Sequence, residues 1–285
     1  MSSKAFGKPQ PVILLAYQRS GTTVLQRTMG ASPLVHNFGE VFLGPKPAHI
    51  VKEYYDDWNL YAETNFFNFK EKAVAENPAL LLPSPENQET LFNLFFDRLA
   101  EHTSKKYFIV DIKYHSWHHL NIFFQEIFHP PFLLRMLLEQ EVKFIHLIRG
   151  NVFEQYVSWI YSKATRKWHY KRKETLRKQK IRIDVRDCEA RMQLSLDSTR
   201  MFERWLSGAS CLNLYYEELF EDGRFSPEVL SKIEGHIGEK LDIPDAPVLK
   251  KVISDVGEVV ENLEEVLDHF RGTPYEKYTY SLCNQ

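Results

Sequence analysis

Short apolar runs alternate with longer amphipathic segments along this chain, and few folds accommodate that alternation. Residues 11–17 (PVILLAY), 107–112 (YFIVDI) and 143–148 (KFIHLI) have the length and composition of buried parallel strands, and 211–216 (CLNLYY) are a fourth candidate. Segments with helical periodicity lie between and after these runs, at 22–29, 88–102, 151–168, 186–206 and 256–270. The sequence therefore predicts an α/β fold with a mostly parallel central sheet flanked by helices.

The bulk properties of the chain limit its domain count and its partners. No repeat or low-complexity linker divides it, so we expect a single P-loop-type domain over residues 1–285. The net charge of −2 provides no basic field for nucleic acid. Residues 1–10 lack an apolar signal core, and no run of about 18 apolar residues predicts a transmembrane segment. The three cysteines form no C-x-x-C pair, which predicts a reduced, cytoplasmic protein.

The first apolar run leads directly into a segment that can bind an anion. A sharp turn between a strand and a helix exposes backbone N–H groups, and these bind phosphate with help from the helix dipole. The glycine in this segment permits a close approach, the hydroxyl groups add donors and the arginine adds a positive charge. The candidate anion-binding residues are Gln18, Arg19, Ser20, Gly21, Thr22 and Thr23. An ordinary strand–turn–helix junction with a serine cap is the alternative interpretation.

A second candidate anion site follows the third apolar run. Arg149 lies at the carboxyl end of that strand, Asn151 can cap the next helix, and Ser158 lies about two turns into it. The planar guanidinium group suits a phosphate, and the serine could converge on the same anion. A surface arginine and a serine bonded to its own helix backbone are the alternative interpretation.

The two segments together resemble the donor motifs of sulfotransferases that use 3′-phosphoadenosine 5′-phosphosulfate (PAPS). These motifs span residues 15–23 and 143–169. Residues 17–23 (YQRSGTT) resemble the 5′-phosphosulfate loop, and residues 144–158 (FIHLIRGNVFEQYVS) resemble the 3′-phosphate motif. Occurring in this order, they indicate an enzyme that transfers a sulfuryl group from PAPS to a hydroxyl group.

Finer details of the motifs resemble one branch of that family. The spacing of nine between Arg149 and Ser158, the Q-R-S-G start and the TRKW sequence at 165–168 look like bacterial trehalose- and lipopolysaccharide-type enzymes. The resemblance therefore implies a carbohydrate or glycolipid acceptor, although a small alcohol, a lipid or a polyketide-like molecule is an open alternative. Related bacterial enzymes can be dimers, so a homodimer is a further possibility.

The resemblance also implies roles for the candidate residues. The backbone N–H groups of residues 19–23 hold the 5′-phosphosulfate, and Arg19 lies near the bridging oxygen, where charge grows as the S–O bond breaks. Arg149 and Ser158 hold the 3′-phosphate, which ATP lacks. The sulfuryl group carries one negative charge, so no metal is expected.

Two residues are candidates for the general base. Glu40 lies just beyond the first helix, in a G-E-x-F context like that of the proposed base of trehalose-type enzymes, and a solvated loop carboxylate is the alternative. His115 follows the second strand and has a convenient pKa. Lys113, two residues earlier, could contact the acceptor or the sulfuryl oxygens, or it could be a surface lysine.

Two further segments could bind a ligand of the enzyme. Residues 43–105 match no donor motif and contain the aromatic stretch 54–69, which could bind the acceptor or pack on the core. The basic stretch 163–182 could steer an anionic ligand, or it could be a solvated face.

Two other functions remain open from the sequence. The first is a P-loop kinase that uses ATP and magnesium, which the loop disfavours because Thr22 stands where the motif G-x-x-x-x-G-K-[ST] requires lysine. Asp111 does end an apolar run like a magnesium-binding strand, but such runs are common in parallel sheets. The second is a non-catalytic module that binds the spent donor, 3′-phosphoadenosine 5′-phosphate (PAP).

Overall fold

The computed structural model describes the residues that build the sheet, most of its helices and both candidate anion sites. The described residues are 9–44, 58–120, 129–165, 179–221, 224–243 and 256–279.

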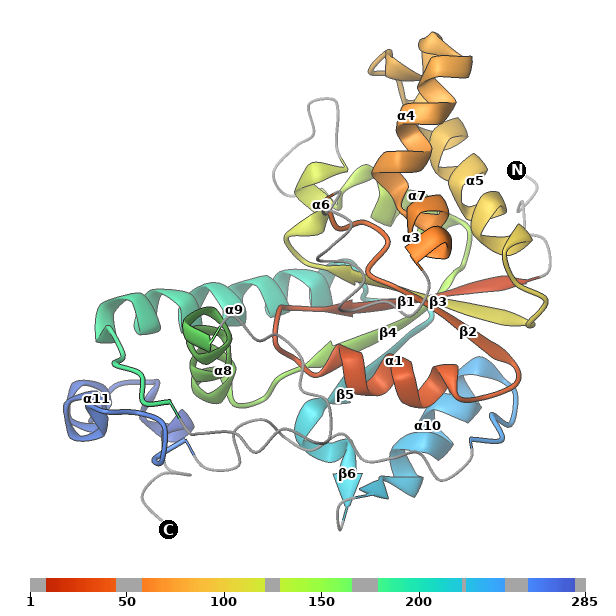
Figure 1. The fold of residues 1–285 in the computed structure, drawn as a ribbon. Coiled ribbons are helices and arrows are strands. Elements are labelled where there is room, and N and C mark those ends of the chain that lie inside the picture. Colours follow the sequence, from red (N-terminus) through yellow and green to blue (C-terminus); the bar gives the residue numbers. More distant parts are fainter. Residues whose placement is uncertain are drawn as a thin grey trace.

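The central sheet has five parallel strands in the order β2-β3-β1-β4-β5 (Figure 1). Their bounds are Val35–Gly39 (β2), Tyr107–Lys113 (β3), Gln10–Ala16 (β1), Lys143–Ile148 (β4) and Cys211–Tyr215 (β5). The four predicted strands are confirmed, with each end displaced by at most one residue. The sequence did not reveal β2, whose residues VHNFG lack a continuous apolar run and whose register shifts between Asn37 and Gly39.

Helices cover both faces of the sheet, as predicted. On one face, α1 (Thr22–Gly30) and α10 (Pro227–Ile237) pack on inward side chains of β1 and β4. On the other face lie α5 (Pro85–Glu101) and α7 (Phe132–Glu139), with the end of α9 (Val185–Trp205). Because both faces are covered, β1 and β3 are buried almost throughout, which explains their continuous apolar runs.

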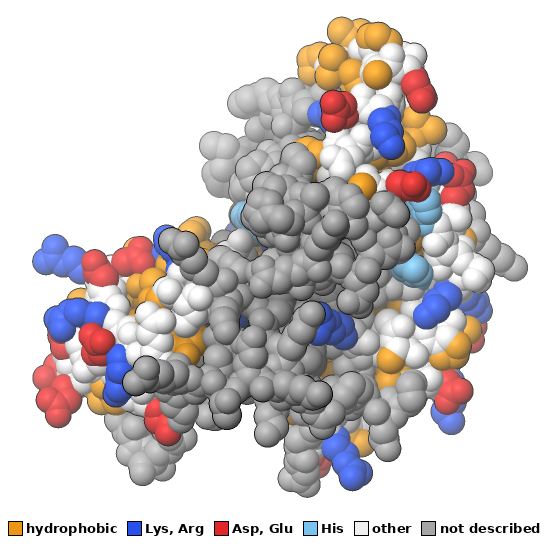
Figure 2. Space-filling view, in the orientation of Figure 1, with side chains coloured by type: hydrophobic (Ala, Val, Ile, Leu, Met, Phe, Trp, Pro, Cys, Tyr) orange, Lys and Arg blue, Asp and Glu red, His pale blue; other side chains and the backbone are white. Residues whose placement is uncertain are grey.

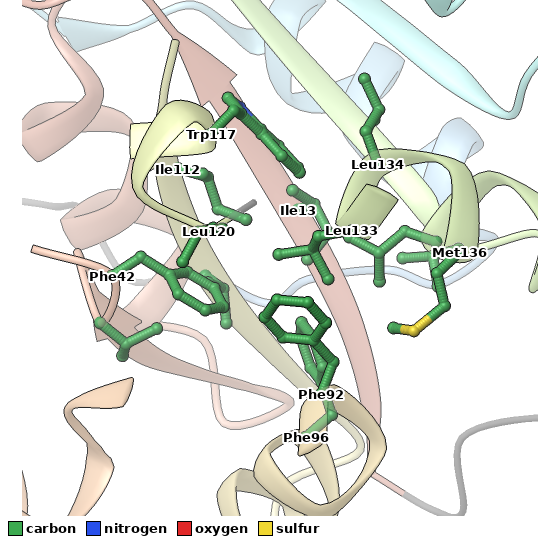
Figure 3. Packing of buried hydrophobic residues seen from close by; sticks show 14 of the residues in the cluster. Ile13, Phe42, Phe92, Phe96, Ile112, Trp117, Leu120, Leu133, Leu134 and Met136 are labelled. Carbon is green, nitrogen blue, oxygen red and sulfur yellow. The ribbon is translucent and has the colours of Figure 1, made fainter. Parts of the chain in front are cut away.

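A helical arm, residues 58–101, projects from the sheet (Figure 1). It consists of α3 (Trp58–Thr64), α4 (Phe66–Glu76), the short helix η1 (Pro78–Leu81) and α5. Figure 3 shows Phe92 and Phe96 of the arm beside Phe42, Ile13 and Ile112 in the core. Hydrophobic side chains also gather at the far end of the arm (Figure 2), where Leu81 and Leu82 are 57% and 59% exposed.

The described part of the aromatic stretch 54–69 belongs to the arm and contributes to the core. Tyr61 and Phe66 are buried, and Phe66 packs at ring-centroid distances of 5.1 Å from Phe42 and 5.2 Å from Phe95. Phe67 and Phe69 lie partly buried against the same core. These rings therefore pack on the core.

A third apolar cluster lies beyond the edge of the sheet and supports the second candidate anion site. It joins α8 (Val152–Thr165), α9 and α11 (Leu263–Phe270). The predicted helix over 256–270 begins later than expected, because Val260 forms a parallel bridge with Ile181 before α11 starts.

Short elements complete the described fold. They are α6 (Ser116–His119), η2 (Tyr216–Glu218), β6 (Phe220–Glu221), β7 (Arg224–Phe225) and η3 (Glu276–Tyr278). Within the described ranges, none of the helices combines the length and apolarity that crossing a membrane requires.

Candidate active site

The turn between β1 and α1 forms the centre of the candidate site. Gly21 is the N-cap of α1 and adopts a left-handed backbone with φ of 86°. A Cβ atom at this position would lie 2.3 Å from Cδ2 of Tyr216, so the backbone and the neighbouring ring both require glycine. Glycine offers no capping side chain to the first N–H groups of α1, and these are the groups that bind an anion at a helix N-terminus.

A side-chain hydrogen bond joins the two candidate anion sites. The Nε–H of Arg19 donates to the Oγ of Ser158 at 3.1 Å, across 139 residues of sequence. Arg19 also has a positive φ of 63°, which is unusual for a residue other than glycine. The loop before α1 and the helix α8 therefore meet at one place, as convergence on a single ligand requires.

A buried glutamine reinforces the same junction. Gln155 of α8 is 3% exposed, and its amide donates to the Oγ of Ser20 at 2.9 Å. The hydroxyl of Ser195 on α9 donates to the Gln155 carbonyl oxygen at 2.7 Å. Sequence reasoning missed both residues. Their signal was a polar side chain on the buried face of a helix, which needs a hydrogen-bond partner.

Arg149 lies at the other end of the candidate site and is 8% exposed. Its guanidinium carbon lies 4.0 Å from the ring centroid of Tyr216, the same ring that contacts Gly21. Two carboxylates flank it: Glu154 accepts from Nη2 at 2.8 Å, and Glu217 lies 3.5 Å from Nε. A phosphate at this arginine therefore has to share it with these carboxylates or displace them.

The N-terminus of α8 already binds a carboxylate. The backbone N–H groups of Gly150 and Asn151 each donate to an oxygen of Glu217 at 3.0 Å. Asn151 caps the helix as predicted, since its side chain accepts from the N–H of Glu154 at 3.0 Å. This segment is thus an anion-binding cradle built from backbone and arginine.

Lys113 is at the centre of a buried charged cluster beside the loop. It lies at the end of β3, and its ammonium donates to Thr22 Oγ1 and Asp111 Oδ2, each at 2.5 Å. It also lies 3.3 Å from Oε1 of Glu40, the first residue after β2. Gln26 of α1 donates to the same Asp111 oxygen at 3.1 Å.

Burial and pairing set the protonation of this cluster. Burial raises the pKa of the Asp111 carboxyl to about 6, although the Lys113 ammonium acts in the opposite direction. Burial acts to lower the pKa of Lys113, but the carboxylates of Asp111 and Glu40 outweigh it and raise that pKa above its usual value. Lys113 is therefore a charged, buried ammonium, and the surface-lysine interpretation is wrong.

His115 lies on the other side of the loop. Its Nε2 is 3.4 Å from the amide nitrogen of Gln18, and the residue is exposed. Both candidate bases thus lie near the loop, Glu40 linked to Thr22 through Lys113 and His115 beside Gln18. Thr23 is the second residue of α1 and is half-buried.

A buried polar pair fixes the strand end that carries His115. The hydroxyl of Tyr114 bonds to Nε2 of His146, whose Nδ1 lies 3.2 Å from the side-chain oxygen of Asn213. Burial lowers the pKa of His146 to about 4, so this imidazole is neutral. Tyr114 also packs edge-on against Tyr17 at 5.9 Å. These contacts hold β3, β4 and the loop together.

A pocket opens between the loop, α8 and α9. Its volume is about 320 Å³, part of which is open solvent, and it is lined by Tyr17, Gln18, Val152, Gln155, Tyr156, Trp159 and Arg191. The guanidinium carbon of Arg191 lies 3.8 Å from the Trp159 ring centroid, and the Lys163 ammonium lies 4.4 Å from it. The pocket combines aromatic rings, amides and cations beside the candidate active site.

The remaining predictions concern a metal site and the basic stretch 163–182. Within the described ranges, no group of three or more histidine, cysteine, aspartate or glutamate residues could hold a metal ion. Most of the basic stretch, 166–178, lies outside those ranges, as does most of the TRKW sequence. At the end of the stretch, Arg182 is exposed and pairs with Glu265 at 2.6 Å.

Comparison with known proteins identifies a family and several similar solved structures. A family model described as "Sulfotransferase family" matches residues 11–241. A solved sulfotransferase domain from the curacin biosynthetic pathway is similar at 13% identity and a TM-score of 0.45, covering 97% of this chain and 98% of that one. A sulfotransferase from Alicyclobacillus acidocaldarius has 12% identity and a TM-score of 0.42, covering 97% and 96%. No curated protein matches the chain.

Proposed function

The chain belongs to the sulfotransferase family, and from that premise we propose that it transfers a sulfuryl group from PAPS to a hydroxyl of a carbohydrate or glycolipid. We propose that residues 1–285 act as one domain in this reaction. The hydrogen bond between Arg19 and Ser158 carries the proposal, because it brings the two candidate anion sites together. A pair of neighbouring anion sites fits a ligand with two anionic groups, and a bisphosphorylated nucleotide is such a ligand.

The chain can supply what sulfuryl transfer requires. Attack by a hydroxyl forms a new O–S bond as the bond from sulfur to the phosphate oxygen breaks, and negative charge grows on that leaving oxygen. The Arg19 side chain and the first N–H groups of α1 can stabilise this charge. Glu40 takes the proton of the attacking hydroxyl, and Lys113 holds this carboxylate near the loop. His115 is the alternative base.

The pocket beside the loop is the proposed acceptor site. Gln18 lines it and also lies beside His115, so a ligand in the pocket would be next to the reacting groups. Aromatic rings and amides suit the apolar faces and hydroxyl groups of a sugar. Arg191 remains partly exposed and adds a positive charge, although Asp187 accepts from its Nε at 3.0 Å.

Binding of the spent donor tests the proposal directly. PAP at about 100 times its Kd should stabilise the protein by about 2.7 kcal/mol, which raises Tm by about 5 °C. ATP should do so much less, because it has no 3′-phosphate. A melting curve unchanged by millimolar PAP would contradict the proposal. Magnesium-dependent ATP turnover would instead revive the kinase interpretation, and PAP binding without transfer to any glycan would favour a binding module.

Replacing Trp159 tests the acceptor pocket. Trp159→Ala should raise the KM for the acceptor about tenfold, corresponding to about 1.4 kcal/mol of lost contact. The Kd for PAP should stay unchanged, since the ring faces the pocket and not the Arg19–Ser158 contact. The acceptor for this assay is first identified by incubating a panel of glycans with the protein and PAPS and detecting the sulfated product by mass spectrometry. Trp159→Phe is the matched control and should lose less; an unchanged KM in Trp159→Ala would place the acceptor elsewhere.

The proposed location is the cytoplasm. Among the described residues, Cys188 is buried, Cys211 is half-buried, and both are free thiols. Free thiols are typical of reducing compartments.

A further inference from the structure

We propose that the Lys113 ammonium is a built-in cation that replaces a divalent metal beside the phosphosulfate loop. In P-loop NTPases, Mg²⁺ is held by the loop serine or threonine and by an aspartate on a neighbouring strand. Here the first residue of α1, Thr22, and the strand residue Asp111 offer a hydroxyl and a carboxylate, with Thr22 one residue before the position of that serine or threonine. The ammonium of Lys113 contacts both.

The sheet register creates this arrangement. Strands β1 and β3 are direct neighbours, with Leu14 opposite Asp111 and Ala16 opposite Lys113. Both β3 residues therefore lie near the carboxyl ends of the strands, where β1 leads into the loop. The side chain of Lys113 is 6% exposed and that of Asp111 is fully buried, so the ammonium is enclosed by the protein.

The surrounding oxygens form a set that suits a hard cation. Thr22 contributes a hydroxyl, and Asp111 and Glu40 contribute carboxylates. The second Asp111 oxygen, Oδ1, is buried and has no hydrogen-bond partner within the described residues. A buried carboxylate oxygen without a donor is costly next to anything except a positive charge. The cluster is thus built around a cation, and the lysine provides it.

The lysine has two consequences for the loop. An ammonium can only donate, so the Thr22 hydroxyl accepts from Lys113, and the same hydroxyl donates to the Asp111 carboxylate, which fixes the first side chain of α1. The same ammonium binds Glu40 and sets its distance from the loop. A single positive charge suits a sulfuryl group, which carries less negative charge than a phosphoryl group. These effects on turnover rest on the proposed function.

A metal-binding experiment tests the cation site without any turnover. Lys113→Ala removes the ammonium and leaves Thr22, Asp111 and Glu40 around the space. Titration with Mn²⁺ followed by electron paramagnetic resonance should show about one bound ion in Lys113→Ala and none in the unsubstituted protein. The double variant Lys113→Ala with Asp111→Asn should lose that ion, and Lys113→Met should bind none because its side chain fills the space.

A turnover experiment tests whether the cation site acts in the reaction. Lys113→Met should lower kcat by about 10²–10³, the usual effect of losing one charged group that acts on the transition state. Millimolar Mg²⁺ should restore part of the activity of Lys113→Ala but none of that of Lys113→Met. A cooperative thermal unfolding transition without any ligand reports that each variant is folded.

The outcomes separate this inference from the proposed function. Folded Lys113→Ala that binds no Mn²⁺, or Lys113→Met with full turnover, would overturn the built-in cation. Mn²⁺ binding by Lys113→Ala in a protein that binds no PAP would support the cation site and overturn the proposed function.

Discussion

Replacing Glu40 with glutamine should lower kcat by about 10²–10⁴, the range for losing a general base. The amide keeps the size of the side chain but cannot take the proton of the attacking hydroxyl. PAP affinity should hardly change, because Glu40 is paired with Lys113, whereas the proposed PAP ligands are Arg19, Arg149 and Ser158. Single-turnover kinetics with saturating PAPS, together with calorimetric titration of PAP, would measure the two effects separately.

Two matched variants show whether this division of roles is correct. Arg149→Ala should weaken PAP binding roughly 10- to 150-fold, since a charge-assisted hydrogen bond contributes about 1.5–3 kcal/mol. Equal loss of PAP binding in Glu40→Gln and Arg149→Ala would contradict separate roles. His115→Gln should retain most of its turnover. If instead it loses more than Glu40→Gln does, the base is His115.

Arg19→Ala should also have a large effect, a fall in kcat of about 10²–10³. Its guanidinium is the full positive charge on the loop, and the hydrogen bond to Ser158 holds it at the junction with α8. Loss of this charge should weaken stabilisation of the leaving oxygen more than it weakens PAP binding. Separate measurement of the fold change in kcat and of the fold change in Kd for PAP would test this.

The left-handed backbone at Arg19 supplies a control for folding. Arg19→Gly removes the same charge but relieves a conformation that costs other residues roughly 1–2 kcal/mol. Arg19→Gly should therefore be as inactive as Arg19→Ala, but its Tm should be higher than that of Arg19→Ala. Arg19→Lys should recover part of the activity. Full activity in either Arg19→Ala or Arg19→Gly would remove Arg19 from the reaction.

Complete burial made three strands easiest to predict, although the less buried β5 was also predicted, from CLNLYY. Strands β1, β3 and β4 are covered on both faces, and this leaves a continuous apolar run in the sequence. Strand β2 lies at the edge of the sheet and carries His36 and Asn37, so its pattern is broken. The helix α10 was missed although Ser226 caps it and Pro227 begins it. Its buried face is narrow, with Val229, Ile233 and Ile237.

The candidate site was predictable where a local motif carries it. The segment from Gln18 to Thr23 is contiguous, and Arg149 and Ser158 share one strand–helix unit. Contacts made across the chain left no local signal: Glu217 reaches Gly150 from 67 residues away. The cluster of Glu40, Asp111 and Lys113 depends on the register of neighbouring strands, which single-sequence periodicity does not fix.

The attachment of the helical arm has a consequence for engineering. Asn65 at the start of α4 is fully buried, and its amide donates to the carbonyl oxygens of Val41 and Leu43. The N–H of Phe66 donates to the same Val41 oxygen at 2.9 Å. Glu40 is the adjacent residue in the chain, so the arm and this carboxylate share one backbone anchor. A chimaera that exchanges the arm for one from another protein must keep Asn65 and Phe66, or Glu40 will shift with the graft.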